Sequence, residues 1–221
     1  MQIDSAVLSQ TVLMGSYGVA LPLVGAFARR IGWRRLATSS SEFHLWAICA
    51  VGLMVLWSVR TGVTAGPALH VLGVTTVTLV LGVPAAALIT FLAQGVTSFI
   101  ANDVTGLPMN WLISSVVPIT VTELWRRLTL RCLPHDPFAF IFGAAFFGAA
   151  LAVAAAYLVG LAFVGEPGMF RAGAVPSWGA MLLLVGFPEA FINGAMVTLL
   201  VVYVPERLAG YDPAYRVRHR L

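Results

Sequence analysis

One histidine, His70, stands where a long apolar stretch begins, directly after a run rich in glycine and proline (residues 64–73, TAGPALHVLG). Neutral imidazole is the commonest side-chain ligand of transition metals in proteins. Irregular backbone at membrane depth is tolerated only where it is buried in protein or lines a cavity. The pattern is therefore compatible with a metal ligand. A lone histidine is more often an ordinary residue at a membrane interface, and the residue types alone leave both interpretations open.

Four other polar side chains lie within or beside apolar runs, where such groups are costly and often mark a pathway, a pair or a ligand site. Asp103 and Asn110 flank a turn. Instead of serving a ligand site, Asp103 could be an ordinary turn residue and Asn110 could cap a helix. Gln94 lies inside an apolar run. Glu189 follows Pro188, which should kink its helix and free backbone carbonyls. We expect Glu189 to bind these carbonyls as a neutral acid or to pair with a partner.

The elements that carry these residues are predicted to be membrane-spanning helices. Of the 221 residues, 59% are hydrophobic and 10% are charged, against about 45–50% and about 25% in soluble domains. A spanning helix needs about 20 apolar residues. The sequence predicts an all-α polytopic helix bundle that forms a single transmembrane domain over residues 1–221. The seven expected spans cover residues 8–28, 43–59, 69–83, 84–100, 110–125, 138–164 and 178–204.

The basic residues predict the orientation of these spans. All thirteen are arginines, and eleven of them follow the first and fifth spans or lie after the last one. With seven spans these eleven share one face, and only Arg60 and Arg171 fall on the other. The positive-inside rule then places the N-terminus outside and the C-terminus in the cytoplasm. Because the arginines form short clusters between apolar runs, and no basic stripe is present, we expect no nucleic-acid partner.

Several classes of chemistry have no motif in this chain. It contains no GxxxxGK[ST] loop for ATP and no HExxH, CxxC or GxSxG sequence, so we expect neither an enzyme nor a bound cofactor. Cys49 and Cys132 are predicted to lie at different depths, which argues against a disulfide between them. Glu123 is expected to pair with Arg126 and Arg127 at the inner surface.

The sixth span is rich in small residues that permit close helix contact. Two interpretations are open: packing inside the bundle, or a docking face for a partner membrane protein. The residues concerned are Gly143, Gly148, Ala152 and Ala156.

Residues 62–84 (GVTAGPALHVLGVTTVTLVLGVP) resemble the characteristic block of the CbiM/NikM family. Members of this family are the substrate-capture membrane components of energy-coupling-factor cobalt and nickel transporters. In this resemblance His70 falls on the family's histidine, and Gly73 and Gly82 fall on its glycines. The likeness continues at Gln94, at residues 106–118, and at residues 186–194, which include Glu189.

The resemblance implies uptake of a divalent transition metal, cobalt or nickel, captured on the outer side of a bacterial cytoplasmic (inner) membrane. In the family, the N-terminal amine, a histidine in second position and the loop histidine form a nitrogen-rich cage, which suits these ions. The implied partners are membrane lipid, a coupling transmembrane protein and cytoplasmic ATPases. The metal is then a transported substrate, not a resident cofactor.

The second residue departs from the family, because Gln2 stands where the histidine is expected. An amide supplies no imidazole, so the expected metal site is rebuilt from His70 and the amine of Met1, with Asp4 and Gln2 as weaker candidates. Alternatively, the chain is a non-transporting membrane interaction or assembly protein that has diverged from the family. The residues expected along the substrate pathway or in support of the site are Asn110, Gln94, Glu189 and Asp103.

Overall fold

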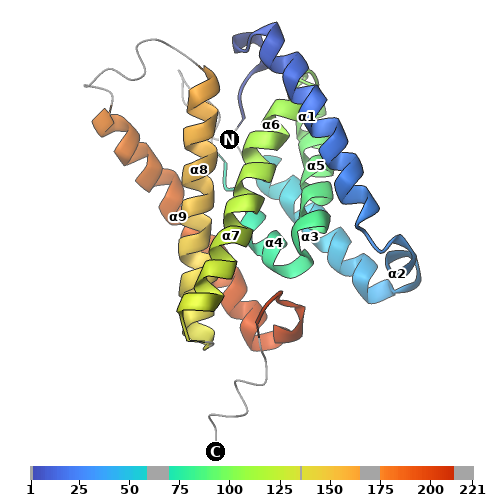
Figure 1. Cartoon of the computed structure of the whole chain (residues 1–221), viewed down its shortest axis with the longest axis vertical. Coiled ribbons are helices and arrows are strands. Elements are labelled where there is room, and N and C mark those ends of the chain that lie inside the picture. The colour runs from blue at the N-terminus through green and yellow to red at the C-terminus, as the bar shows by residue number, and fades with distance from the viewer. Residues whose placement is uncertain (1, 59–69, 135, 165–174, 212–221) are drawn as a thin grey trace, which may run out of the picture.

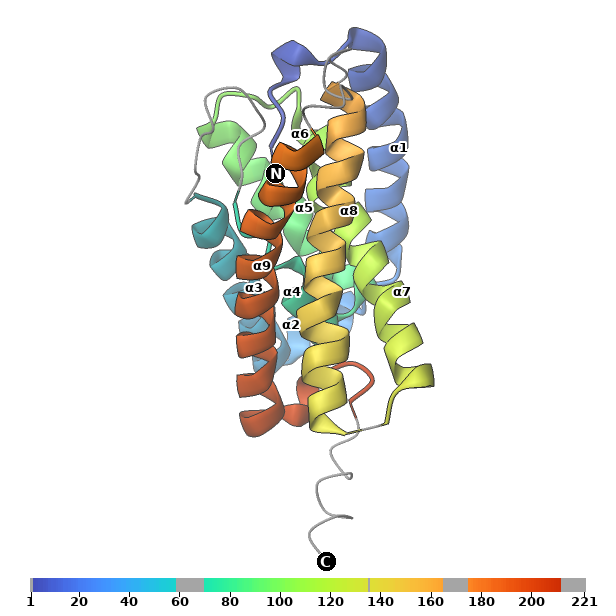
Figure 2. The same cartoon turned by 90° about the vertical axis from the view of Figure 1, so that its left-hand side faces the viewer.

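The computed structural model describes residues 2–58, 70–134, 136–164 and 175–211, with the backbone alone for residues 164 and 175–181. Every regular element in these ranges is a helix, and the helices form an elongated bundle (Figure 1; Figure 2). The long helices are α1 (Gln10–Arg29), α3 (Ser40–Ser58), α5 (Val83–Ile100), α7 (Val117–Cys132), α8 (Gly148–Val164) and α9 (Val175–Tyr203). The polytopic all-α fold predicted from composition is confirmed.

Short helical turns connect and extend the long helices. The short elements are η1 (Ser5–Val7), α2 (Trp33–Thr38), α4 (Val74–Leu81), α6 (Leu107–Trp111) and η4 (Pro205–Arg207). Two π-helical stretches, η2 (Leu112–Val116) and η3 (Ala139–Phe147), join α6 to α7 and lead into α8. The fifth expected span therefore belongs to one helical run from Leu107 to Cys132.

Five helices of the described chain are long and apolar enough to cross a membrane: Gln10–Arg29, Ser40–Ser58, Val83–Ile100, Ala139–Phe163 and Leu182–Tyr203. Their burial differs sharply. Only 11% of the apolar window of α1 or α3 is buried inside the protein, against 56% for α5. The α1 and α3 helices turn apolar side chains outward, as membrane-spanning helices do. The α5 helix forms the centre of the bundle.

The third expected span, residues 69–83, is corrected by the structure. Its residues Val74–Leu81 form α4 and Val83 already begins α5, and the eight residues of α4 make a helix about 12 Å long. A bilayer core is about 30 Å thick, so α4 is a half-helix buried within the bundle. Its ends are set by Gly73 and Gly82, which have φ values of 65° and 76°. Positive φ is readily adopted only by glycine and breaks the helix at both positions.

The small-residue face of the sixth expected span packs inside the bundle. A methyl group added at Gly143 would lie 2.7 Å from Thr129, and one added at Gly148 would lie 3.2 Å from Trp125. The Trp125 indole also donates to the Gly143 carbonyl at 2.9 Å. Farther along α8, Ala152 and Ala156 are buried. Internal packing is confirmed, and the hypothesis of a docking face on these residues is wrong.

The arginine-rich elements gather at one end of the bundle, which we name the basic end. It consists of α2, the C-terminal turns of α7, and η4, and it lies opposite η1 (Figure 1). Glu123 pairs with Arg126 and Arg127 at 2.9 and 2.6 Å, as expected. Both cysteines are free thiols. The clustering agrees with the expected topology, while the side of the membrane that the basic end faces stays a prediction.

Candidate functional site

The first residues of the chain run into the opposite end of the bundle as an extended segment, the N-terminal thread (residues 2–8), which includes η1 (Figure 1). Ile3 is 1% exposed. Its N–H donates to Asn110 Oδ1 at 2.8 Å, and Asn110 Nδ2 donates back to the Ile3 carbonyl at 2.9 Å. Asn110 was expected to orient a ligand or cap a helix. It instead holds the backbone of the thread by both polar atoms of its amide.

A second anchor comes from the loop before α6. Asp103 accepts from the N–H of Ser5 at 3.1 Å, from the N–H of Gly106 at 3.1 Å and from the Thr105 hydroxyl at 3.3 Å. The Thr105 hydroxyl also lies 2.9 Å from that of Ser5. Partial burial of Asp103 opposes ionisation, but these hydrogen bonds outweigh it and hold the pKa of Asp103 below its ordinary value. The ionised carboxylate therefore stabilises the docked thread.

Docking of the thread should depend on pH through Asp103. A carboxyl whose pKa is lower in the folded state contributes stability above its unfolded pKa, about 3.9, and loses it as pH falls through the folded value. We expect hydrogen exchange at Ser5 to be slow and nearly constant from pH 7 to about pH 4, after correction for the intrinsic rate, and to quicken below it. Asp103→Asn should remove this dependence; an equally steep acid transition in that variant would show that another group controls docking.

The backbone before α4 is non-helical from His70 to Gly73, as the glycines and proline before it suggested. Trp57, at the end of α3, donates from its indole to the Leu72 carbonyl at 2.8 Å. The Trp57 ring also lies 5.4 Å from the His70 imidazole, with 49° between the ring planes. His70 is 9% exposed. Trp57 was not singled out from the sequence, because a tryptophan at the end of an apolar span is ordinarily an interfacial anchor.

The buried carboxylate of Glu189 binds the same segment from α9. Its Oε2 accepts from the N–H of Leu72 at 2.6 Å, and its Oε1 accepts from the N–H of Gly73 at 2.8 Å. Both oxygens thus act as acceptors toward free N–H groups at the start of α4, where the helix dipole favours negative charge. The expectation that Glu189 binds carbonyls freed by Pro188 is wrong. The backbone groups that Glu189 binds are donors in the segment before α4, and α9 continues through Pro188.

Asn193, one turn farther along α9, completes this cap. Its Oδ1 accepts from the N–H and the hydroxyl of Thr76 at 2.9 and 2.8 Å. Its Nδ2 donates to Glu189 Oε1 at 2.7 Å. Side chains of α9 therefore satisfy backbone donors at the first turn of α4 and fix the position of residues 70–73. Asn193 and Glu189 thus form a hydrogen-bonded pair that caps α4.

The N-terminal thread and the segment 70–73 lie side by side in both views (Figure 1; Figure 2). Gln2 is half-buried there, whereas Met1 lies outside the described residues. Asp4 is exposed, and its carboxylate accepts from the Ala6 N–H at 2.9 Å as the cap of η1. Gln94 is buried within α5 and donates to Ser98 of the same helix at 3.2 Å. The hydrogen bond of Gln94 is therefore to a residue of its own helix, and none links it to the thread or to residues 70–73 in the described chain.

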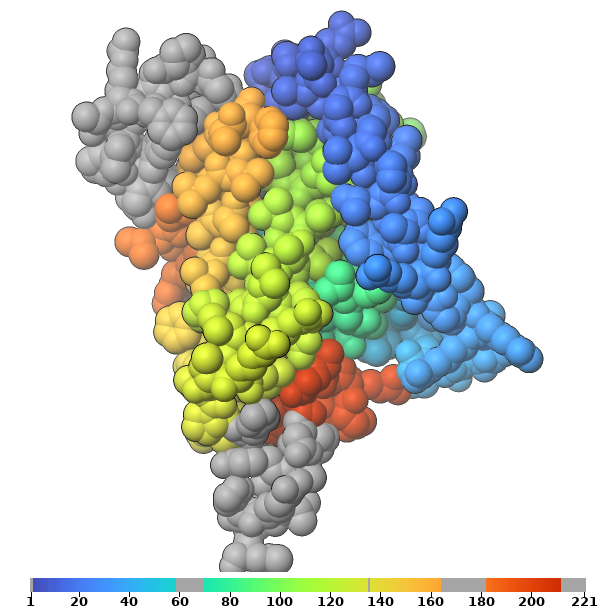
Figure 3. Space-filling model, viewed as in Figure 1, coloured from blue at the N-terminus to red at the C-terminus, as the bar shows by residue number. Residues whose placement is uncertain are grey.

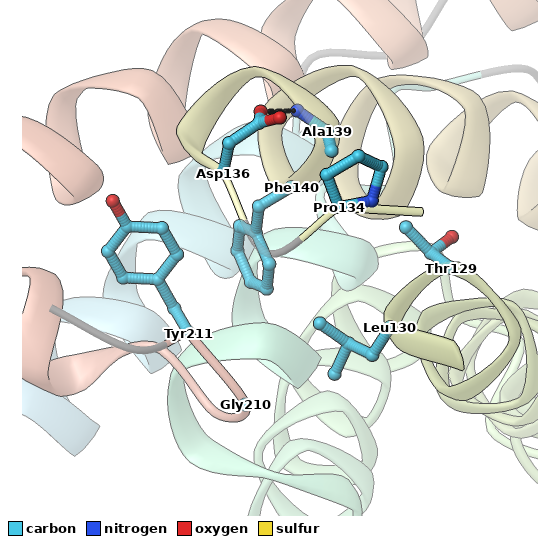
Figure 4. Close-up of a pocket in the computed structure, with 8 residues that line it drawn as sticks. All are labelled: Thr129, Leu130, Pro134, Asp136, Ala139, Phe140, Gly210 and Tyr211. Atoms are coloured by element: carbon cyan, nitrogen blue, oxygen red, sulfur yellow. Dashed lines mark hydrogen bonds between the residues drawn. The ribbon is translucent and has the colours of Figure 1, made fainter. Parts of the chain in front are cut away.

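Within the described ranges, no three side chains of histidine, cysteine, aspartate or glutamate gather in a metal-binding arrangement. A small cavity between α7, η3 and the C-terminal segment is lined by Thr129, Phe140 and Tyr211 among others (Figure 4). Its volume of about 10 Å³ is at most the space of one water molecule. This cavity is too small for a substrate. The thread and residues 70–73 therefore remain the candidate site.

Comparison with known proteins agrees with this architecture. The family model of CbiM, described as the cobalt uptake substrate-specific transmembrane region, matches residues 2–207. A crystal structure of a truncated transition metal transporter is similar, with a TM-score of 0.77, 19% identity, and coverage of 92% of this chain and 99% of that one. A second, of a transition metal transporter, has a TM-score of 0.73, 20% identity, and coverage of 99% and 100%. No curated protein matches the chain.

Proposed function

This chain belongs to the CbiM family, and we propose that it captures a cobalt or nickel ion for uptake by an energy-coupling-factor transporter. Membership of the family makes it a membrane component of metal uptake and not an enzyme. The observation that supports capture at a specific site is the insertion of the N-terminal thread beside His70, with Ile3 bound through both backbone groups by Asn110. The proposed membrane is the bacterial cytoplasmic membrane, with the thread on its outer side.

The proposed site uses nitrogen donors. Cobalt and nickel are borderline ions that imidazole and amine nitrogen suit well, and His70 supplies the imidazole. The N-terminal amine of Met1 is the second proposed donor, because the buried Ile3 directs the beginning of the chain into the bundle. Gln2 contributes only a weak amide ligand. Asp4 is the least favoured donor, since its carboxylate already caps η1.

Neighbouring side chains hold these donors in place rather than bind the ion. Asn110 and Asp103 fix the thread, while Trp57 and Glu189 fix residues 70–73. Such preorganisation lowers the conformational cost of binding. A coupling transmembrane protein and cytoplasmic ATPases are the proposed partners, and they would act from the basic end.

The deciding experiment is metal binding by detergent-purified protein that keeps a native, untagged N-terminus. Titration with nickel, cobalt and zinc should give one bound ion per chain for the preferred metal, and His70→Ala should weaken it at least tenfold, about 1.4 kcal/mol. His44→Ala is the matched control, because His44 is an exposed histidine at the start of α3. We expect this control to bind metal like the wild type.

Two results would argue against metal capture. One is the absence of binding by folded wild-type protein at metal concentrations far above those that a capture protein needs. The other is equal loss of binding in the variants of His70 and His44, which would indicate non-specific association with histidines.

Gln2 favours a second candidate function, that of a membrane interaction or assembly protein that no longer transports metal. Loss of the expected second imidazole weakens the ligand set without disturbing the fold. Under this alternative, His70→Ala leaves the function of the chain in cells intact. Under metal capture, the same substitution abolishes metal-dependent growth at limiting metal concentration.

A further inference from the structure

The basic end contains a cavity that the proposed metal capture does not use. Its volume is about 250 Å³, and its lining comes from the end of α1, from α2, from the first turns of α3 and from the turn between α4 and α5. The α2 helix and the start of α3 project from the bundle at this corner (Figure 3). The volume lies just below the usual range of ligand pockets, about 300–1,000 Å³, and suits a small headgroup.

The charges around this cavity do not balance. Arg30 and Arg35 line it together with one carboxylate, Glu42. Glu42 is already shared, because it pairs with Arg35 at 2.9 Å and with Arg207 at 3.0 Å. Arg30 makes no ion pair or side-chain hydrogen bond with any residue in the described part of the chain. The cavity therefore has a surplus of positive charge, with one guanidinium available to an anion.

The remaining residues of the lining are apolar. Leu81, Pro84 and Trp46 are half-buried members of the lining. The Trp46 ring lies 6.3 Å from that of Trp33, and tryptophans of this kind concentrate at the level of lipid headgroups. Part of the lining comes from the end of α1 and the first turns of α3, and the apolar windows of these two helices are the least buried of the candidate spans. A ligand here would have both an anionic group and an apolar body.

We propose that this cavity is a binding site for the phosphate of an anionic phospholipid. Arg30 and Arg35 contact the phosphate, and the glycerol lies against Trp46, Leu81 and Pro84. The acyl chains extend onto the lipid-facing surfaces of α1 and α3. Basic pockets between membrane helices are suited to anionic headgroups, and the planar guanidinium matches phosphate geometry. The proposal is independent of the metal site at the other end of the bundle.

Native mass spectrometry of the full chain in detergent tests this site by titration with phosphatidylglycerol and, separately, with phosphatidylcholine. Phosphatidylglycerol should bind preferentially, with at least one lipid retained per chain. Arg30→Gln should weaken this binding about fivefold, the effect of one basic residue at a membrane surface. Arg30→Lys keeps the charge and should lose less than Arg30→Gln.

The matched control is Arg131→Gln, which removes an exposed arginine in the last turn of α7, outside the cavity. It should change lipid affinity less than twofold, and melting temperatures should show that all variants are folded. Equal weakening in the variants of Arg30 and Arg131 would overturn the proposal in favour of general charge attraction. Displacement of the lipid by millimolar inorganic phosphate would overturn it in favour of a free anion. If Arg30→Gln binds lipid like the wild type but metal uptake in cells is lost, the proposal is overturned. Arg30 would then contact a partner protein instead of a lipid.

Discussion

Replacing Glu189 by alanine should lower the free energy of unfolding by roughly 2–6 kcal/mol, the cost of two buried donors left without acceptors at about 1–3 kcal/mol each. The donors are the N–H groups of Leu72 and Gly73, bound at 2.6 and 2.8 Å. Glu189 is 2% exposed, so water cannot readily replace the lost oxygens. The cost is high because no other acceptor in the described part of the chain binds these two N–H groups.

The substitution should also impair metal binding, since residues 70–73 carry His70 and take their position from this cap. Glu189→Gln keeps one carbonyl oxygen and should retain part of the stability. Denaturant unfolding in mild detergent gives the change in free energy, and metal titration gives the change in affinity. Glu206→Ala is the control for a glutamate that is exposed and unpaired in the described structure. It should change stability by no more than about 0.5 kcal/mol. If Glu189→Ala is as stable as this control, the cap has no energetic importance.

Asn110→Ala should release the N-terminal thread and weaken metal binding by roughly 10- to 100-fold. The variant loses two buried hydrogen bonds to Ile3, each worth about 0.5–1.5 kcal/mol. If the site is complete only when the thread is docked, the apparent affinity for metal falls in proportion to the fraction of molecules whose thread is docked. Hydrogen exchange at Ile3 and Ser5 reports docking directly, and metal titration reports the consequence.

The control for Asn110 is Thr198→Ala, which removes a polar group that bonds only within α9, to the Gly194 carbonyl at 2.8 Å. In this variant, hydrogen exchange at Ile3 and Ser5 and the affinity for metal should match those of the wild type. Asn110→Asp is informative as well, because it keeps the acceptor for the Ile3 N–H and loses the donor to the Ile3 carbonyl. Rapid exchange at Ile3 with unchanged metal affinity in Asn110→Ala would separate the thread from metal capture and move the proposed site to other residues.

Features with a local cause could be predicted from the sequence. Apolar run length determines which segments enter lipid, and the five helices long enough to span correspond to five of the seven expected segments. Arginine clustering predicted one basic end, and Glu123 pairs with its near neighbours on the same helix. These properties depend on residues a few positions apart, so a linear scan detects them.

The contacts that build the candidate site leave no pattern among residues that are close together in the sequence. Asn110 binds a residue 107 positions away, and Glu189 binds two residues that lie 117 and 116 positions away. Hydropathy also treats residues 69–83 as one apolar run, because glycine is compatible with an apolar segment. The positive φ values of Gly73 and Gly82 convert that run into a half-helix. Which donors face Glu189 is decided by the packing of α9 against α4, and composition carries no information on that.

The cap on α4 also determines when the site can exist during biosynthesis. The chain is made from the N-terminus, so the thread and α4 emerge long before α9, which supplies Glu189 and Asn193. Until that last long helix is inserted, the start of α4 lacks the acceptors on Glu189 and Asn193, and Trp57 alone of the anchors described above binds residues 70–73. We therefore expect a nascent or truncated chain to hold His70 less firmly than the complete protein does. Assembly of the proposed site is thereby coupled to completion of the protein, and we expect unfinished chains in the membrane to bind metal less tightly than the complete chain.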